Sequence, residues 1–177
     1  MLLSFSLAIL AVLGAAAPVE LDARASAPPY RYIHPANAPD QCITAVPGTK
    51  GYEGTQLVVR PCVASADQRF RVNWPTTTVK FLAHPELCID SSGTPGKPDK
   101  KPKLKAGRPA LLLPCPAGPN VGENMTTPVN GYWDRSDYTH LRLWGTDVCL
   151  DGSGGAVHQS RCDGGVGQEW LFDVVGE

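Results

Sequence analysis

The sequence predicts an all-β domain that is built from three copies of one structural unit. Three observations lead to this prediction. The six cysteines fall two by two into three similar segments, and each segment closes on an aromatic residue. Apolar residues occur in short runs bounded by Gly, Pro, Asn and Asp, which is typical of strands joined by turns. No long stretch has the apolar spacing of an amphipathic helix.

Each unit starts with a cysteine, an aliphatic residue and a polar residue, continues to a second cysteine and closes on an aromatic residue. The opening triplets are Cys42-Ile43-Thr44, Cys88-Ile89-Asp90 and Cys149-Leu150-Asp151, the second cysteines are Cys62, Cys115 and Cys162, and the closing segments are Gln68-Arg69-Phe70, Gly131-Tyr132-Trp133 and Gln168-Glu169-Trp170. Only the third closing segment keeps Gln-x-Trp intact. A fixed internal period indicates repeats that close on one another, because one repeat cannot bury its apolar face alone.

We expect about four strands in each repeat and about twelve in all. A first strand precedes each first cysteine and forms a hairpin with it, a second runs into the second cysteine, and a last strand follows the closing aromatic residue. The first strands are expected at 30–33, 78–82 and 140–144, the second at 56–59, 110–113 and 156–159, and the last at 70–72, around Trp133 and at 170–174. The closing aromatic residues are predicted to lie in the core, with Gln68 and Gln168 bonding to backbone beneath them.

The first residues of the chain have the features of a secretory signal peptide. Residues 1–17 form a short apolar run that ends on the small residues Ala15 and Ala17. A signal anchor is the alternative, but this run is shorter than the roughly 20 residues that a membrane span needs. We therefore predict a secreted, extracellular protein with a flexible segment at 18–29 and one domain at 30–177.

Secretion places the six cysteines in an oxidising compartment, where an even number of them implies disulfides. Six cysteines allow 15 connectivities, so the count alone does not choose among them. The distribution of two cysteines per repeat favours pairing within each repeat: Cys42 with Cys62, Cys88 with Cys115, and Cys149 with Cys162. Zinc is the competing interpretation, but no Cys-x-x-Cys or His-x₃-His spacing occurs. We expect no metal and no cofactor.

The net charge of −1 gives no general reason to expect nucleic acid or an anionic membrane as a partner. The second repeat contains two insertions. The first, at 91–108, carries six Lys or Arg residues against one Asp. This segment is either a patch that binds an anionic glycan or a lipid head group, or a solvated loop, and we favour the loop. The second, at 116–127, contains the sequence Asn124-Met125-Thr126, which predicts N-glycosylation of Asn124 on an exposed loop.

The three cysteine pairs in phase with three closing aromatic residues resemble the ricin-B-type lectin family over roughly residues 30–175. This resemblance implies a β-trefoil fold, disulfides within each repeat and carbohydrate ligands, for example galactose-type or related sugars. It also implies three kinds of sugar contact in each repeat. The family's sugar-binding Asp lies two residues after the first cysteine, where this sequence has Thr44, Asp90 and Asp151. Its stacking aromatic residue lies two residues before the second cysteine, where this sequence has Arg60, Leu113 and Ser160. Its Asn lies just before the closing Gln, where this sequence has Asp67, Asn130 and Gly167.

No repeat keeps the complete set of sugar contacts. A carboxylate suits a vicinal diol because it offers two acceptor oxygens, so Thr44 leaves the first repeat without its main ligand. The candidate binding residues are Asp90 and Asn130 in the second repeat, and Asp151 with the nearby His158 in the third. The alternative role of Asp90 and Asp151 is turn formation after a strand, and we weigh the two roles evenly.

The sequence contains no Gly-x-Ser-x-Gly, no His-Glu-x-x-His and no phosphate-binding loop, and the repeats occupy the whole predicted domain, so we expect no enzymatic activity. The most favoured function is that of a secreted carbohydrate-binding protein with partly eroded sugar sites. The alternative is a β-trefoil scaffold that binds a protein partner, such as a secreted inhibitor or effector, because a fold does not determine a function.

Overall fold

The computed structural model describes residues 30–72, 76–91, 107–116, 131–135, 137 and 139–174. Several predictions from the sequence fall outside these residues. They are the signal peptide at 1–17, the segment at 18–29, most of the lysine-rich insertion, the glycosylation site at Asn124 and the candidate ligand Asn130.

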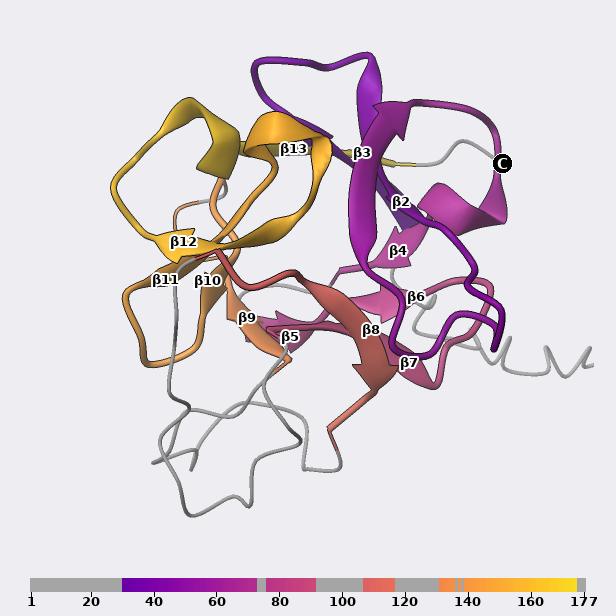
Figure 1. The fold of residues 1–177 in the computed structure, drawn as a ribbon. Helices are drawn as coiled ribbons and strands as arrows, with labels where there is room; N and C mark the ends of the chain where they lie inside the picture. The colour runs from indigo at the N-terminus through magenta and orange to yellow at the C-terminus, as the bar shows by residue number, and fades with distance from the viewer. Residues whose placement is uncertain are drawn as a thin grey trace, which may run out of the picture.

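The described residues form thirteen short strands and three single 3₁₀ turns, which confirms the all-β class (Figure 1). The elements are β1 (Tyr30–Pro35), β2 (Gln41–Ala45), β3 (Leu57–Pro61), η1 (Ala66–Gln68), β4 (Phe70–Arg71), β5 (Thr76–Thr78), β6 (Lys80–Phe81), β7 (Leu87–Asp90), β8 (Leu111–Pro114), β9 (Tyr132–Asp134), β10 (Arg142–Leu143), β11 (Val148–Asp151), η2 (Ser153–Gly155), β12 (His158–Arg161), η3 (Val166–Gln168) and β13 (Trp170–Val174).

The strands agree with the sequence in order and nearly in number, and they differ from it at their ends and in one pairing. The hairpin expected between the first strand and the strand of the first cysteine forms in the second and third repeats, as β6 with β7 and β10 with β11. It does not form in the first repeat, where β1 pairs with β13 and β4, and β2 pairs with β3. The thirteenth strand arises because the run predicted at 78–82 becomes β5 and β6, which pair with different neighbours. The strand predicted at 140–144 is shorter, since β10 holds only Arg142 and Leu143. The strands β3, β8 and β12 each start one or two residues later than expected.

In each repeat, the strand of the first cysteine forms an antiparallel hairpin with the strand that leads to the second cysteine: β2 with β3, β7 with β8, and β11 with β12. Each hairpin is closed by a disulfide within the repeat, so the predicted pairing is confirmed for Cys42–Cys62, Cys88–Cys115 and Cys149–Cys162. In Figure 1 the three hairpins lie around a common centre rather than side by side in one sheet.

The three hairpins are joined to one another by a closed ring of backbone hydrogen bonds. The N–H of Leu57 donates to the carbonyl of Ala110 at 3.0 Å, Ala110 donates to Val157 at 2.9 Å, and Val157 donates back to Leu57 at 3.0 Å. All three side chains are fully buried. The ring gives the hairpins an approximate threefold axis.

The remaining strands form a barrel wall beneath the hairpins. Strand β1 pairs with both β13 and β4, and β4 pairs with β6. Strand β9 pairs with β5 and β10. The wall closes where the N–H of Trp170 in β13 donates to the carbonyl of Thr139 at 2.7 Å. The wall thus brings the first and last strands of the described chain together.

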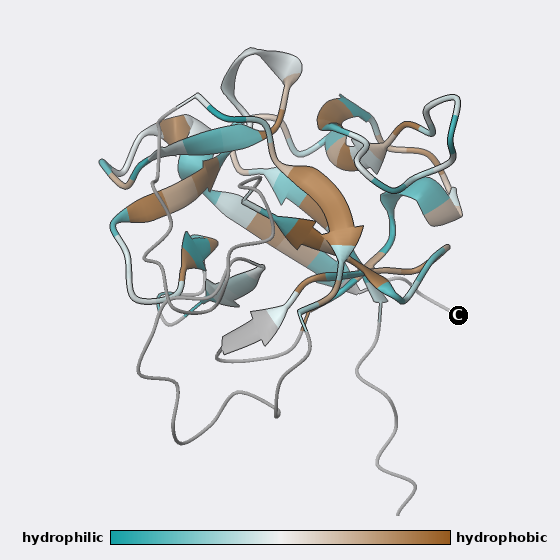
Figure 2. Cartoon of the chain, turned by 60° about the horizontal axis from the view of Figure 1, so that its bottom comes forward, coloured by the Kyte–Doolittle hydropathy of each residue, from teal (hydrophilic) through white to brown (hydrophobic). Residues whose placement is uncertain are grey.

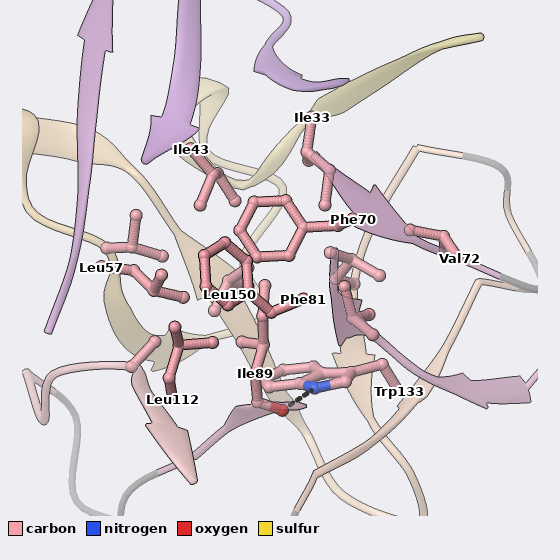
Figure 3. Close-up of a cluster of buried hydrophobic side chains, with 14 of the residues drawn as sticks. Ile33, Ile43, Leu57, Phe70, Val72, Phe81, Ile89, Leu112, Trp133 and Leu150 are labelled. Carbon is pink, nitrogen blue, oxygen red and sulfur yellow. Dashed lines mark hydrogen bonds between the residues drawn. The ribbon is translucent and has the colours of Figure 1, made fainter. Parts of the chain in front are cut away.

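The core lies between the wall and the hairpins, and Figure 3 shows Phe70 and Trp133 among the aliphatic side chains that fill it. Phe70, Trp133 and Trp170 are all fully buried, as predicted. The indole N–H of Trp133 donates to the carbonyl of Ile89 at 2.9 Å, and that of Trp170 donates to Leu150 at 3.1 Å. Figure 2 shows that hydrophobic residues concentrate on the central strands. No helix among the described residues is long and apolar enough to cross a membrane.

We predict that Gly152→Ala destabilises the protein by about 1–3 kcal/mol, because it overpacks the core. A Cβ atom at this position would lie 2.7 Å from Cη2 of Trp170 and 3.2 Å from Cγ2 of Val59, and the Trp170 ring is fully buried. The measurement is chemical denaturation. Gly48→Ala is the control, because the nearest atom to its Cβ is 3.7 Å away. Equal midpoints for the two variants would contradict this packing.

Candidate functional site

The polar residues that follow the first cysteines occupy equivalent places in the three repeats. Thr44, Asp90 and Asp151 lie in β2, β7 and β11, and each is more than nine-tenths buried. Each repeat brings this residue close to its own closing segment, as the resemblance implied. The family resemblance implies that the sugar contacts of each repeat would lie around this residue.

In the third repeat, Gln168 holds the closing segment against the strand that carries the second cysteine. Its side-chain N–H donates to the carbonyl of Arg161 at 2.7 Å, and its side-chain oxygen accepts the N–H of Asp163 at 3.1 Å. The same amide nitrogen lies 3.4 Å from Oδ2 of Asp151. Gln168 therefore joins three parts of the repeat and orients the candidate carboxylate.

Gln68 makes the same contacts in the first repeat. It donates to the carbonyl of Pro61 at 2.9 Å and accepts the N–H of Val63 at 2.6 Å. It also donates to the hydroxyl of Thr44 at 2.8 Å, and that hydroxyl donates to the carbonyl of Cys42. The structural role predicted for both glutamines is confirmed. The Thr44 hydroxyl thus uses its single O–H and one of its two lone pairs within the protein, which agrees with a first repeat that lacks its main sugar ligand.

The second repeat replaces this glutamine with Gly131, and the structure shows why the exchange is tolerated. The residue after Cys115 is Pro116, which has no N–H to donate to a glutamine oxygen. Gly131 has a positive φ of 83°, and a Cβ atom there would lie 3.1 Å from Oδ2 of Asp90 and 3.3 Å from Cδ of Pro116. Close packing of Pro116 on Gly131 thus replaces the hydrogen-bonded bridge.

The Asp151 carboxylate is held by a short network at the end of β11. Its Oδ1 accepts the N–H of Ser153 at 2.8 Å, and its Oδ2 lies near the Gln168 amide. Burial by itself raises the pKa of this carboxyl, but hydrogen bonds from the Ser153 hydroxyl and N–H act in the opposite direction. Gln168 and the charge of His158 add to them, so the pKa lies below the ordinary aspartate value and Asp151 is ionised at neutral pH.

His158 and Gly167 complete the surroundings of Asp151. Nε2 of His158 lies 4.0 Å from Oδ1 of Asp151, and its Nδ1 lies 3.1 Å from the carbonyl of Ala156. The side chain is partly exposed, so the structure brings these two predicted residues together at the surface. Gly167 stands where the family has Asn, and a Cβ there would lie 2.6 Å from Asp151 Oδ1. The missing Asn therefore has a steric cause.

The first repeat contains a pair that the sequence analysis did not identify as a pair. The hydroxyl of Tyr52 donates to Oδ1 of Asp67 at 2.6 Å, and this bond is the main reason that the pKa of Tyr52 is raised. The Tyr52 ring also contacts the rings of Phe81 and His84, each at a centroid distance of 5.0 Å. Tyr52 lies in a hairpin loop with no counterpart in the repeat pattern, so no periodic signal identified it.

No stacking ring stands at the expected place in any of the three repeats. Arg60 is exposed, and Leu113 and Ser160 are half-buried. One His–Cys cluster exists among the described residues: Nδ1 of His34 lies 3.3 Å from Sγ of Cys62 and 3.6 Å from Sγ of Cys42. Both sulfurs form a disulfide, so this cluster offers no thiolate to a metal ion.

Comparison with solved structures identifies the fold as a β-trefoil. The chain is similar to the designed threefold-symmetric protein ThreeFoil, with a TM-score of 0.56, 12% identity, and coverage of 82% of this chain and 99% of the other. It is similar to the β-trefoil lectin of the Vibrio vulnificus hemolysin/cytolysin, solved with N-acetyl-D-lactosamine, with a TM-score of 0.53, 14% identity, and coverage of 86% and 98%.

A third similar structure is the Polyporus squamosus lectin bound to Neu5Aca2-6Galb1-4GlcNAc, with a TM-score of 0.55, 14% identity and coverage of 82% of this chain. The chain spans about half (49%) of that lectin and 17% of a mosquitocidal holotoxin that it also resembles. The structural neighbours are thus β-trefoil lectins and parts of larger proteins, all at low identity. No protein-family model matches the sequence, and no curated protein does.

We predict that Asp151 contributes to acid sensitivity. Because its pKa is lower in the folded protein than the unfolded value of about 3.9, its stabilising effect is present above that value and is lost as the pH falls through the lowered pKa. The difference in unfolding free energy between wild type and Asp151→Asn should therefore shrink from about pH 6 to about pH 3. Asp147→Asn, at a well-exposed site, is the control. A constant difference would contradict the pKa direction.

Proposed function

We propose that this protein is a secreted carbohydrate-binding protein whose main sugar contact is the carboxylate of Asp151. The observation that carries the proposal is the state of this carboxylate. It is ionised, oriented by Ser153 and Gln168, and placed beside the partly exposed imidazole of His158. A charged acceptor next to the Nε2 atom of an imidazole suits two neighbouring sugar hydroxyls, because each hydroxyl can both donate and accept. The β-trefoil fold, which the sugar-bound lectins named above share, supports the proposal at the level of the fold.

The geometry also indicates that binding is weak. A carboxylate has about four lone-pair sites, and Ser153 and Gln168 already use up to three of those on Asp151. No aromatic ring stands at the expected place to pack on the apolar face of the sugar. Affinities in the millimolar range correspond to only about −4 kcal/mol, so each missing contact matters. We expect useful binding only when several copies of the protein or of the sugar act together.

Asp90 is the second proposed sugar contact. It is buried to the same degree as Asp151 but lies against Gly131 and Pro116, without the glutamine bridge. Its other expected ligand, Asn130, lies outside the described residues, and so does the long insertion that follows Ser91. We therefore expect Asp90 to contribute less than Asp151. Galactose-type sugars are the first ligands to test, in keeping with the family resemblance.

Secretion, glycosylation at Asn124 and the absence of enzymatic activity are further parts of this proposal. Three disulfides support an oxidising compartment, because such bonds persist mainly outside the cytosol. A partner protein is the alternative to a sugar. Val166 in η3, which is 64% exposed beside Gly167, would supply one apolar contact to such a partner.

We predict that Asp151→Asn lowers glycan affinity by at least about tenfold, because such charge-assisted hydrogen bonds are worth about 1.5–3 kcal/mol. Asp90→Asn should lower it less, and Thr44→Asn should leave it unchanged, since the Thr44 hydroxyl is already occupied. The measurement is NMR titration with galactose and N-acetyllactosamine, after a glycan array has identified a ligand. If all three variants bound as wild type does, the carboxylates would play no part, and a protein pull-down would then test the alternative.

A further inference from the structure

The outer face of the barrel wall places two positive charges directly opposite each other. Phe70 in β4 and Phe81 in β6 face each other and point into the core. Their neighbours Arg71 and Lys80 also face each other, and alternation along a strand directs them to the outer surface. On the far side of Arg71, the residue in register is Tyr30 of β1. A row of Tyr30, Arg71 and Lys80 therefore crosses three strands.

The internal symmetry shows that the fold does not need this arrangement. Lys80 lies two positions before a residue whose N–H bonds back to the closing segment. The residues at the same place in the other two repeats are His34 and Arg142. Arg142 lies opposite Asp134 and forms an ion pair with it at 2.8 Å. His34 lies opposite Leu171, and its Nε2 is 3.0 Å from a carboxylate oxygen of Asp173.

Of the three equivalent places, only the one between the first and second repeats joins two cations. Like charges directly opposite each other across two strands are destabilising. No acidic side chain among the described residues lies within ion-pair distance of Arg71 or Lys80. The Nε atom of Arg71 is buried and has no hydrogen-bond partner within that part of the chain. An anion between the two side chains would remove the repulsion.

A third cation and a second tyrosine continue the row along the same face. Arg69 lies two residues before Arg71, which is about 7 Å along a strand. Its Nε donates to the hydroxyl of Tyr32 at 3.3 Å, and its guanidinium carbon lies 5.9 Å from the centre of that ring. Tyr30, Tyr32 and the three cations are all half-buried, so they are held in place yet reachable. Asp173, opposite Tyr32, borders the face.

We propose that this face, formed by Tyr30, Tyr32, Arg69, Arg71 and Lys80, binds an anionic polysaccharide through its sulfate or carboxylate groups. Guanidinium groups bind such groups in a bidentate manner, and tyrosine rings offer apolar surface to sugar rings. The site is separate from Asp151 and does not depend on its binding a sugar. Three cations bordered by an acid, on a chain of net charge −1, form a local site and lack the extended basic surface that follows a nucleic-acid backbone.

The test is Arg71→Asp, which gives the first and second repeats the same pair that Asp134 and Arg142 form in the native chain. Heparin is the sulfated probe, hyaluronan the carboxylated probe and dextran the uncharged one, each measured by calorimetry at two salt concentrations. We expect wild type to bind one or both of the charged probes, in a salt-sensitive manner, but not dextran. Arg71→Asp should weaken that binding at least tenfold while the melting temperature stays equal or rises.

Three control variants distinguish binding at this face from binding elsewhere on the protein and from a general effect of charge. Arg161→Asp makes the same charge change at an exposed position on β12 and should have less than twofold effect. Deletion of residues 95–105 removes most of the lysine-rich insertion, and Asp151→Asn removes the main proposed sugar contact. Both should leave heparin binding intact.

Four results would overturn the proposal, and the first three need no further variant. These three are equal binding by wild type and Arg71→Asp, loss of binding on the deletion alone, and tighter binding to single-stranded DNA than to either charged polysaccharide. If Arg71→Asp lowers the melting temperature, its weaker binding could come from a folding defect. Arg71→Leu then separates the two causes, because it places at position 71 the residue that the equivalent position, Leu171, already has. A folded Arg71→Leu variant that binds heparin as wild type does would also overturn it.

Discussion

The closed ring of hydrogen bonds among Leu57, Ala110 and Val157 is the constraint on which the rest of this structure depends. Each residue is fully buried, so each N–H must find a partner inside the protein or remain unpaired at a cost of about 1–3 kcal/mol. None of the three hairpins can supply these partners alone, because each bond runs from one hairpin to the next. The repeats are therefore stable only together, and the positions that form the ring and the core beneath it accept few residue types.

Positions outside the ring are far less restricted, and it is there that the repeats differ. The same place carries His34, Lys80 or Arg142, and the residue facing it is Leu171, Arg71 or Asp134. Since the fold accepts all three combinations, it does not by itself require two facing cations between the first and second repeats. The three repeats therefore show which positions the fold restricts and which it leaves free. The Arg71–Lys80 pair lies at a position that the fold leaves free, and there it places two cations opposite each other.

The sequence predicted most of the fold because the features that determine it are periodic. Two cysteines and one closing aromatic residue in each repeat were enough to predict the disulfides, the core residues and the order of the strands. The ends of the strands were less accurate, since the break at Val79 between β5 and β6 depends on which neighbour each half pairs with. Such pairing is a tertiary property, and a propensity pattern does not contain it.

The candidate site was predicted less completely, for physical reasons that particular residues illustrate. The sequence identified Asp151 and His158, but the contact of Tyr52 with Asp67 depends on how a non-repeated loop folds back. The sequence alone shows only that Gly131 stands where the other two repeats have a glutamine. The structure shows instead a coupled change, because Pro116 lacks the N–H that a glutamine would accept.

Asp151 shows why stability and the proposed sugar binding would compete in the third repeat. The carboxylate oxygens that accept from Ser153 and Gln168 hold the end of β11 against the closing segment, and the same oxygens would have to accept the hydroxyls of a sugar. Every bond that fixes the carboxylate in place also uses a lone pair that a ligand needs. A site of this kind becomes strong only when a stacking ring adds apolar contact without using those lone pairs. Because Ser160 occupies the position of the ring, the third repeat keeps the hydrogen bonds that stabilise it but lacks the apolar contact that a sugar would need.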